Sequence, residues 1–314
     1  MNPLLPSLPV LTPAVAPRGR ADDKRPGVAG WLPVAILPAL VGGATRDRLP
    51  AWGFMWALCF ALYAGCKALT LHDALRRNPG VPFARLVAYL LAWPGMDAAA
   101  FLRSPVPRAR PAAREWIFAA GKLVFGLVLT WELTPHLASD HPALAGWTGM
   151  VGLIFLLHFG TFHVLSLGWR CFGVRAEPLM RAPVLATSLA EFWGKRWNAA
   201  FHELVHRYTF RPLLRATGAG GATLLVFFLS GLIHELVISV PARGGYGGPT
   251  AYFLISGAGL LLAHSRTGRR WGLGTGWRGR VFTLVTVAAP VGLLFHPPFV
   301  HRVILPFLHA IGAT

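Results

Sequence analysis

Apolar stretches separated by short, mostly basic segments dominate the 314-residue chain. A helix needs about 20 apolar residues to cross roughly 30 Å of hydrocarbon. Seven stretches approach that length: 29–45, 50–71, 115–133, 147–168, 222–241, 249–264 and 281–296. Strand-like alternation of apolar and polar residues is absent. The pattern therefore predicts an all-α, polytopic membrane helical bundle of about seven to eight spans, plus re-entrant or interfacial helices.

Basic residues set the expected orientation and test this map of spans. The apolar piece 82–93 ends at Pro94-Gly95 and is too short to cross, which predicts a re-entrant or interfacial helix; a second short piece covers 298–311. With a cytoplasmic N-terminus, 24 of the 30 Lys and Arg residues lie on the inside, in segments 1–28, 72–114, 169–221 and 265–280. Four lie outside: Arg46, Arg48, Arg243 and Arg302. This asymmetry follows the positive-inside rule and supports a non-spanning 82–93.

Composition narrows the class of protein. The chain is 54% hydrophobic and 13% charged, whereas soluble domains carry about 25% charged residues. The net charge of +18 alternates with the apolar stretches, so it favours membrane orientation over nucleic-acid binding. We expect a Pro-rich cytoplasmic tail over 1–27 and a single membrane-embedded domain over 28–314. Arg outnumbers Lys by 26 to 4, which suggests GC-rich codons and hence a bacterial plasma membrane.

Cysteine usage gives no sign of a covalent or metal framework. Cys59, Cys66 and Cys171 form an odd set without tight spacing, which is typical of neither disulfides nor a zinc knuckle. We expect them to be small apolar packing residues.

His234 stands out because ionisable residues inside membrane segments are costly and usually functional. Its place in 222–241 puts it about 18 Å from the cytoplasmic end of that stretch. A neutral imidazole can act as a general base near pH 7; a structural His, hydrogen-bonded across the bundle, is the alternative. The adjacent Glu235 points about 100° away, so we expect it to pair with a cation elsewhere or to orient a neighbouring helix.

A second candidate segment precedes that stretch. Ser188 and Glu191 form the S-x-x-E pattern of a capping box, so a helix is predicted to start here. Aromatic and basic side chains follow it: Phe192, Trp193, Lys195, Arg196 and Trp197. These residues are typical of a helix in the membrane interface, with aromatics at headgroup depth and cations toward water. Asn198 adds an uncharged donor and acceptor near the membrane entrance, although the segment also fits an anchor without chemistry.

A third pattern competes with these. His202-Glu203-Leu204-Val205-His206 matches H-E-x-x-H, which places two imidazoles on one helix face for zinc. A catalytic zinc also needs a third ligand, and the chain has no evident companion motif, so we disfavour a zinc protease. His158 and His163 either line the same cavity as His234 or cap packed helices, and the second interpretation is favoured.

Together these residues resemble the membrane-bound O-acyltransferase superfamily. The resemblance rests on Phe192-Trp193-Gly194-Lys195-Arg196-Trp197-Asn198, followed by Ser230-Gly231-Leu232-Ile233-His234-Glu235 in an apolar stretch. Its plant-type wax synthase branch, with bacterial relatives, is most similar. The end of the chain also resembles this branch, at His296-Pro297-Pro298-Phe299 and Ile304-Leu305-Pro306-Phe307, as does Gly160-Thr161-Phe162-His163 through Trp169-Arg170. The resemblance covers about residues 150–310.

The resemblance implies a multi-span helical enzyme that transfers an acyl group from acyl-CoA to a hydroxyl. His234 then corresponds to the catalytic residue, and Asn198 to the family's conserved Asn or Asp position. The domain expected over 28–314 becomes an acyltransferase domain. We expect substrate-binding roles for six residues: Trp193, Lys195, Arg196, Trp197, Ser230 and His163. Of these, Lys195 and Arg196 are suited to hold the CoA phosphates while the acyl tail enters the bundle.

The most favoured acceptor is a long-chain alcohol, which gives a wax ester. A sterol, diacylglycerol or a polysaccharide is the alternative acceptor, and an intramembrane zinc protease or a non-catalytic lipid carrier is less favoured. The expected partners are acyl-CoA as co-substrate, a lipophilic alcohol and the lipid bilayer, without nucleic acid. We expect no metal and no resident cofactor, and the sequence leaves the oligomeric state open.

Overall fold

In the computed structural model, residues 28–103 and 110–314 are described; the Pro-rich tail expected over 1–27 lies outside them. The described part is built from helices and contains no strand. The predicted all-α class is therefore confirmed.

Many of the described helices follow one another with short connections, whereas a largely irregular segment, 172–188, joins α8 to α9. The α-helices are α1 Val28–Thr45, α2 Ala51–Arg77, α3 Phe83–Ala92, α4 Ala98–Leu102, α5 Ala113–Leu127, α6 Thr134–Ala138, α7 Pro142–Ile154, α8 Phe162–Cys171, α9 Leu189–Glu191, α10 Ala199–Val205, α11 Arg211–His234, α12 Val240–Ala242, α13 Gly248–His264, α14 Arg266–Arg270, α15 Gly276–Ala288, α16 Val291–Leu294, α17 Pro297–Phe299 and α18 Leu305–Ala310. Wider π-helical turns join several of them: η1 Val128–Leu133, η2 Phe155–Thr161, η4 Phe192–Arg196, η5 His206–Phe210, η6 Glu235–Ser239 and η7 Val300–Ile304. A short 3-10 turn, η3, covers Pro183–Leu185.

The number of spans is lower than the sequence predicted. By length and composition, four continuous helices of the described residues can cross a membrane: Ala51–Arg77, Ala113–Ala138, Pro142–Cys171 and Ala199–Ala242. A fifth candidate, Gly276–Leu294 with Pro297–Ala310, bends by 60° at its break. The prediction of about seven to eight spans is therefore wrong, because the apolar helix Gly30–Thr45 and the 17-residue α13 are shorter than the roughly 20 residues that a crossing needs, and the stretch 281–296 ends at this bend.

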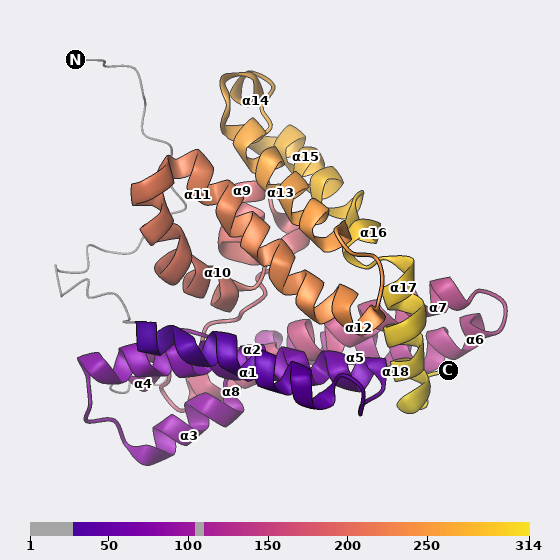
Figure 1. The fold of residues 1–314 in the computed structure, drawn as a ribbon, viewed down its shortest axis with the longest axis horizontal. Coiled ribbons are helices and arrows are strands. Elements are labelled where there is room, and N and C mark those ends of the chain that lie inside the picture. Colours follow the sequence, from indigo (N-terminus) through magenta and orange to yellow (C-terminus); the bar gives the residue numbers. More distant parts are fainter. Residues whose placement is uncertain (1–27, 104–109) are drawn as a thin grey trace.

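One helical run with a sharp kink contains both the H-E-x-x-H segment and His234 (Figure 1). Ala199–Ala242 runs for 44 residues, but Gly218 adopts φ 69° and ψ 177° inside it. Glycine tolerates this backbone conformation, which side chains on other residues disfavour. The kink at Gly218 separates the region around α10 from the apolar part that was expected as the span 222–241.

Helix α3 has ten residues, a length of about 15 Å, so it is too short to span, as the sequence predicted. Its C-terminal end is held by Lys67 of α2, whose buried Nζ donates to the carbonyl oxygens of Tyr89, Trp93 and Gly95 at 2.9, 2.6 and 2.7 Å. A cation at a helix C-terminus satisfies carbonyls that have no partner within the helix. Lys67 thus fixes α3 against α2.

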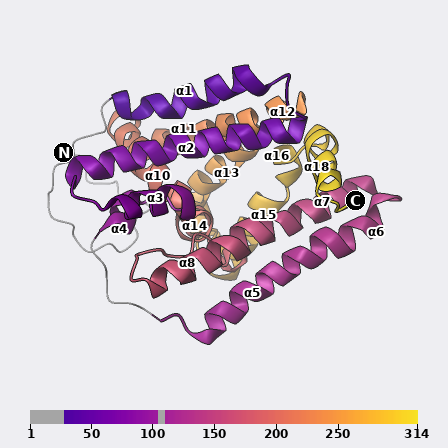
Figure 2. The same ribbon diagram turned by 90° about the horizontal axis from the view of Figure 1, so that it is seen from below.

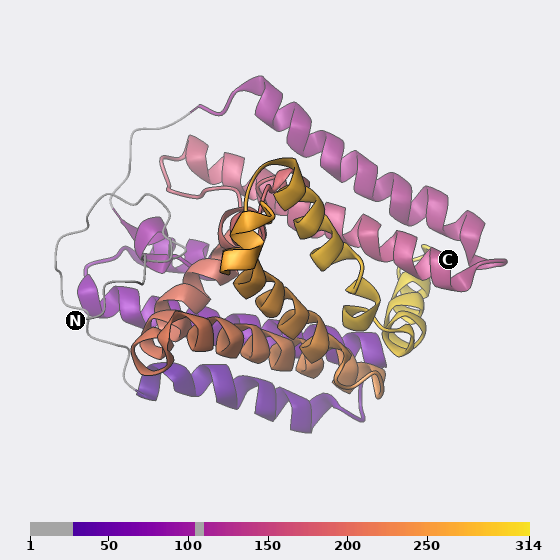
Figure 3. The same ribbon diagram turned by 90° about the horizontal axis from the view of Figure 1, so that it is seen from above.

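The long helices form two groups with α13 between them. Helix α1 lies along α2 on one side, and α5 lies along α7 and α8 on the other (Figures 1 and 2). Helix α13 packs against α11, α9, η6 and α16, and its orange ribbon lies beside that of α11 in Figure 3. The largest apolar core gathers here and includes Phe227, Phe253, Leu260 and Leu294. The end of α11, where His234 lies, is therefore packed against a central helix.

Candidate active site

His234 is the last residue of α11, and its imidazole is half-buried. Nδ1 lies 2.7 Å from the carbonyl oxygen of Ser230. Because a carbonyl oxygen only accepts, Nδ1 carries the proton in this hydrogen bond and Nε2 keeps its lone pair. Within the described chain, Nε2 has no hydrogen-bond partner. A neutral imidazole fixed in this tautomer is suited to accept a proton at Nε2.

Aromatic rings connect His234 with Trp193. The imidazole lies 4.4 Å from the ring of Phe253, centroid to centroid. Trp193 contacts the same ring at 5.7 Å and meets Phe227 of α11 edge-on at 5.8 Å. The structure therefore brings two of the predicted site residues, His234 and Trp193, to one aromatic cluster.

The indole of Trp193 has a buried Nε1 with no acceptor among the described residues. A buried N–H without a hydrogen bond is unfavourable, so such groups are uncommon in folded proteins. At this place, next to Phe253 and His234, the N–H is a candidate donor to a bound carbonyl or hydroxyl oxygen.

Glu235 secures the helix that carries Phe253. Its Oε1 accepts hydrogen bonds from the backbone N–H of Gly247 at 2.9 Å, and from the N–H and hydroxyl of Thr250 at 3.2 and 3.0 Å. These groups lie in the first turn of α13, where backbone N–H groups lack partners and a carboxylate is favoured by the helix dipole. Of the two roles expected for Glu235, the structure shows the second, orientation of a neighbouring helix.

Gly231 explains how closely α11 and α13 approach each other. A Cβ at this position would lie 2.6 Å from Cα of Thr250. Because that distance is far below van der Waals contact, a larger residue would push the helices apart. The Ser-Gly-x-x-His pattern thus combines close packing with the placement of His234. The Ser230 hydroxyl itself donates to the carbonyl of Val226 at 2.9 Å.

Asn198 occupies a defined backbone position at the start of α10. It adopts the left-handed conformation, with φ 43° and ψ 62°, and its Oδ1 accepts from the N–H of Phe201 at 3.2 Å. Asn tolerates this conformation better than most residues and is also a preferred N-cap. No hydrogen bond or ring contact joins Asn198 to His234 in the described residues. The geometry accounts for Asn198 as a helix cap, and leaves its predicted catalytic role as a prediction.

Residues 172–182 form an irregular segment, called the clamp below, that contacts Asn198 and the residues beside it. The N–H of Ala199 donates to the carbonyl of Leu179 at 2.9 Å, and the N–H of Arg181 donates to the carbonyl of Arg196 at 2.8 Å. The backbone N–H of Asn198 points to Sδ of Met180 at 3.2 Å. This segment has neither apolar periodicity nor a motif, so its sequence does not predict the contact.

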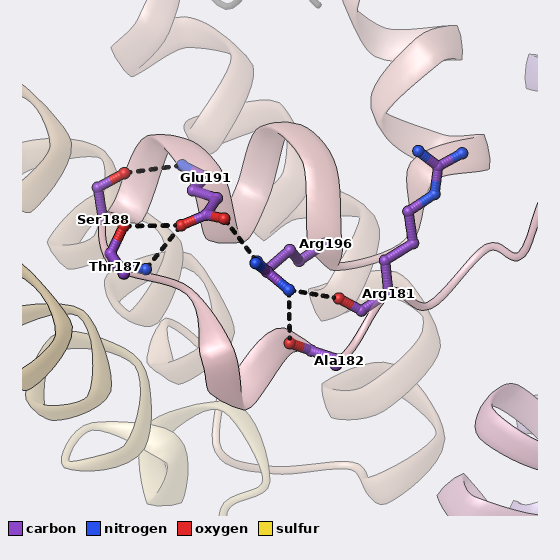
Figure 4. A network of polar contacts seen from close by, with 6 residues as sticks. All are labelled: Arg181, Ala182, Thr187, Ser188, Glu191 and Arg196. Carbon is purple, nitrogen blue, oxygen red and sulfur yellow. Dashed lines mark hydrogen bonds and ion pairs between the residues drawn. The ribbon is translucent and has the colours of Figure 1, made fainter. Parts of the chain in front are cut away.

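Glu191 and Arg196 tie the start of α9 to the same clamp (Figure 4). The Ser188 hydroxyl accepts from the N–H of Glu191 at 3.1 Å, so the predicted helix start is confirmed. The Glu191 carboxylate accepts from the N–H and hydroxyl of Thr187, at 2.7 and 2.9 Å, rather than from the N–H of Ser188. Arg196 donates Nε to Glu191 at 2.7 Å, and Nη1 to the carbonyls of Arg181 and Ala182 at 3.0 and 3.3 Å.

The partners of Glu191 also set its protonation. Burial opposes ionisation of the carboxyl, but the hydrogen bonds from Thr187 and Arg196 outweigh it and hold the pKa of Glu191 below its ordinary value. The carboxylate is therefore ionised at neutral pH, and the ion pair with Arg196 is kept.

The other predicted substrate-binding residues are spread around this centre. Lys195 is exposed, and Trp197 stacks on Phe192 with ring centroids 5.7 Å apart. His163 lies at the α5–α8 contact instead, where its Nδ1 is 3.1 Å from Nζ of Lys122. In the part of the chain that the structure describes, no hydrogen bond or ring contact links His163 to His234.

The H-E-x-x-H residues lie one after another along α10 and η5. The rings of His202 and His206 stack with centroids 5.8 Å apart, and His206 in turn stacks on Phe210 at 5.4 Å. Across residues 28–103 and 110–314, no group of three or more His, Cys, Asp or Glu side chains is gathered that could hold a metal ion. The two imidazoles are part of a stacked column of rings.

Sequence reasoning missed Phe253, Thr250 and Thr187. Phe253 contacts the imidazole of His234, but one aromatic residue in an apolar stretch gives no signal by itself. Thr250 and Thr187 supply donors to Glu235 and Glu191. The sequence contains one signal for these two donors. An acidic residue in an apolar chain needs hydrogen-bond donors nearby, because burial of an unpaired carboxylate is costly.

Comparison with known proteins gives a family match over the segments that contain Asn198 and His234. Residues 176–258 match the model of the membrane bound O-acyl transferase family. The match begins in the clamp and includes both Asn198 and His234. The structure and this match support an integral membrane protein, as the long apolar helices indicate.

Curated proteins similar to this chain are named as acyltransferases. Over 215 residues, the chain is 28% identical to probable long-chain-alcohol O-fatty-acyltransferase 9 of Arabidopsis thaliana. This alignment covers 62% of this chain and 61% of the relative. It is 31% identical over 146 residues to the long-chain-alcohol O-fatty-acyltransferase of Simmondsia chinensis, covering 40% and 39% of the two chains. It is 35% identical over 74 residues to acyl-CoA–sterol O-acyltransferase 1 of Arabidopsis thaliana, covering 21% of each.

The chain thus spans less than two thirds of the length of these relatives. The resemblance to the wax synthase-like branch of the membrane-bound O-acyltransferases is confirmed.

Proposed function

We propose that this chain, a relative of the wax synthase-like membrane-bound O-acyltransferases, transfers an acyl group from acyl-CoA to the hydroxyl of a lipophilic acceptor. The observation that carries the proposal is the hydrogen bond from His234 Nδ1 to the Ser230 carbonyl, which leaves Nε2 as the basic nitrogen. The names of the relatives support a long-chain alcohol as the acceptor and a wax ester as the product.

In the proposed reaction, Nε2 of His234 takes the proton of the acceptor hydroxyl. The alkoxide oxygen attacks the thioester carbonyl, and a bond forms between that oxygen and the acyl carbon. The C–S bond then breaks, the electron pair leaves with the CoA sulfur, and the imidazolium returns the proton to the thiolate. The products are the ester and free CoA, and the step needs neither metal nor resident cofactor.

Two donors are candidates for the developing oxyanion. The unpartnered N–H of Trp193 lies in the aromatic cluster of His234. The amide of Asn198 is the second candidate, and its Oδ1 is already used to cap α10. Loss of one such donor typically costs about 10²–10³ in rate.

The CoA phosphates would meet the basic end of η4. Arg196 is tied to Glu191 and to two carbonyl oxygens, so its first role is to hold the backbone. Lys195 is exposed beside it and supplies the charge that is available to an anion. We therefore assign the direct phosphate contact to Lys195 and the shaping of the segment to Arg196.

The membrane arrangement completes the proposal. A cytoplasmic N-terminus puts the basic segments, and hence acyl-CoA, on the inside, while the alcohol arrives from the bilayer. The single acyltransferase domain over 28–314 also belongs to the proposal. A bacterial plasma membrane stays a prediction from composition, since the relatives named above are plant proteins.

The experiment offers labelled palmitoyl-CoA to the detergent-purified chain with hexadecanol, a sterol or diacylglycerol, with and without a chelator. We expect labelled ester with hexadecanol in excess over the other acceptors, and no effect of the chelator. If the chain preferred the sterol or diacylglycerol, that acceptor would replace the long-chain alcohol in the proposal, and acyl transfer itself would stand. Loss of activity with the chelator, together with bound zinc at His202 and His206, would favour the zinc alternative. Lipid binding without turnover in any mixture would favour a carrier.

A further inference from the structure

Three arginines from separate parts of the chain line a cleft at one end of the bundle. Arg46 follows α1, Arg243 follows α12 and Arg302 lies in η7. These elements meet at the same end in two views (Figures 1 and 2). The cleft has a volume of about 330 Å³, which lies within the range of about 300–1,000 Å³ for small-ligand sites.

The walls of this arginine cleft combine charge with apolar surface. The remaining lining residues are Leu49, Ala51, Phe54, Pro241 and Ala242. A lining of arginines and apolar residues fits a molecule with an anionic group and a hydrocarbon part. The charge pattern places four basic residues on the non-cytoplasmic side, and these three arginines are among them. The positive-inside rule accounts for basic residues in cytoplasmic segments, so it does not explain these three.

Two of the arginines are held in place by the protein. Arg302 donates Nη1 to the carbonyls of Ala242 and Arg243, both at 3.1 Å. Among residues 28–103 and 110–314, no acceptor contacts Nη2 or Nε of this guanidinium. Arg243 adopts the left-handed conformation, with φ 50°, as the C-cap of α12, so the end of that helix sets its backbone.

Arg46 differs from the other two. Its side chain is exposed and forms no ion pair or hydrogen bond with any described residue. Arg243 pairs with Asp47 at 3.0 Å, but the two side chains are 64% and 82% exposed, and a pair this exposed contributes little stability. An anion can therefore recruit Arg46 and Arg243 without breaking a structural bond of the core.

We propose that the arginine cleft binds a phosphate-bearing anion, held by the guanidinium groups of Arg46, Arg243 and Arg302 with its apolar part against Leu49 and Phe54. Guanidinium groups match phosphate geometry and form charge-assisted hydrogen bonds with it. The phosphate comes either from a phospholipid of the bilayer or from a soluble phosphate ester. This inference is independent of the proposed acyl transfer and of the acceptor.

Two residues that line the cleft are also close in sequence to His234, the candidate base. Pro241 and Ala242 end the helical run Ala199–Ala242 that contains His234, and seven helical residues correspond to about 10 Å. A ligand here would contact the far end of the same helix, beyond η6.

The test measures binding to the full-length, delipidated chain in detergent by native mass spectrometry. Phosphatidylglycerol and phosphatidylcholine are titrated separately, with sn-glycerol 3-phosphate as a soluble competitor. Arg46→Gln is the test variant, because its side chain has no bond that folding needs. Arg270→Gln is the matched control, since it changes an exposed arginine in α14 at the other end of α13.

We expect the wild type to prefer phosphatidylglycerol. Arg46→Gln should weaken that binding about five-fold, the usual effect of one basic residue at an anionic lipid surface, and Arg270→Gln should leave it unchanged. Displacement by glycerol phosphate would identify a soluble ester as the source of the phosphate, and its failure to displace would identify the lipid. Unaltered binding in Arg46→Gln, or an equal loss in both variants, would overturn the proposal.

Discussion

Glu235 accepts two hydrogen bonds from Thr250, one from the backbone N–H at 3.2 Å and one from the hydroxyl at 3.0 Å. This contact fixes the first turn of α13, the helix that places Phe253 against His234. Neighbouring residues in the His-Glu pair thus have different tasks. His234 supplies the candidate base, and Glu235 holds the helix that packs on it.

Removal of the hydrogen-bond acceptor at Glu235 should impair turnover more than substrate binding. Glu235→Ala removes the three hydrogen bonds to Gly247 and Thr250, and we expect kcat to fall about ten-fold or more because a small displacement at the base is costly. Glu235→Gln keeps one acceptor oxygen and should recover part of kcat. Steady-state kinetics measure both, with KM close to the wild-type value. The control is Glu132→Gln, which changes an exposed residue of η1; a wild-type kcat in Glu235→Ala contradicts the positioning role.

Trp193→Phe should separate stability from activity. Phe keeps an aromatic ring against Phe253 and Phe227 but removes the buried, unpartnered N–H. Since an unsatisfied buried donor costs about 1–3 kcal/mol, the thermal midpoint should stay or rise. Acyl transfer should fall about 10²-fold if the N–H serves the oxyanion.

A matched control for this change exists on α2. Trp56 also has a buried Nε1 without a partner in the described residues, but its ring packs on Phe60 and Phe307. Trp56→Phe should therefore leave acyl transfer unchanged. Full activity in Trp193→Phe would remove Trp193 from the proposed reaction.

Asn198→Gly distinguishes a cap from a chemical role. Gly adopts the left-handed conformation of this position and replaces Asn at an N-cap at a cost of only a few tenths of a kcal/mol. We expect a folded protein whose thermal midpoint is close to that of the wild type and whose acyl transfer is reduced about 10²-fold. Ala182→Gly, at a second left-handed residue of the clamp, should keep activity. If Asn198→Gly were fully active, Asn198 would be a helix cap and no more.

Glu191 should make stability depend on pH in the acid range. Its pKa in the folded chain lies below the ordinary value of about 4.5, so it stabilises the fold above that value and loses this effect as the pH falls through the lower, folded pKa. Glu191→Gln should lower the thermal midpoint by a few degrees at pH 7. The difference from the wild type should shrink below about pH 4.5 and then vanish.

Thermal unfolding of both proteins across pH 3–8 tests this expectation. Glu177→Gln, on a carboxylate that is 71% exposed and 4.0 Å from Arg181, is the control and should change little. A Glu191→Gln effect of the same size at every pH would mean that packing, and not charge, connects Glu191 with Arg196.

The sequence predicts the positions of the helices better than it predicts the turns that join them. Apolar length identifies the regions of α2, α5, α11 and α13, but the π-helical turns η1, η2 and η6 depend on local hydrogen bonding that no periodicity reveals. The bend between Leu294 and Pro297 follows from the prolines of the C-terminal motif, and it falls between two apolar pieces that the sequence already separates, 281–296 and 298–311.

The candidate site is predictable in part for a similar reason. His234 is evident because a titratable group in an apolar stretch is expensive, and Asn198 because its segment resembles a family motif. The contacts of Phe253 with His234 and of Leu179 with Ala199 join residues far apart in sequence. Such contacts are set by tertiary packing, so a single chain without its fold does not disclose them.

Acyl transfer by His234→Ala tests the central claim most directly. The wild type and the variant are purified as folded, monodisperse proteins and given labelled palmitoyl-CoA and hexadecanol. The control is His264→Ala, because Nδ1 of His264 makes the same type of bond, 2.8 Å to the carbonyl of Leu260 four residues earlier. We predict that His234→Ala lowers the rate by about 10²–10⁴ and that His264→Ala does not. Undiminished ester formation in His234→Ala would contradict the assignment of His234 as the base.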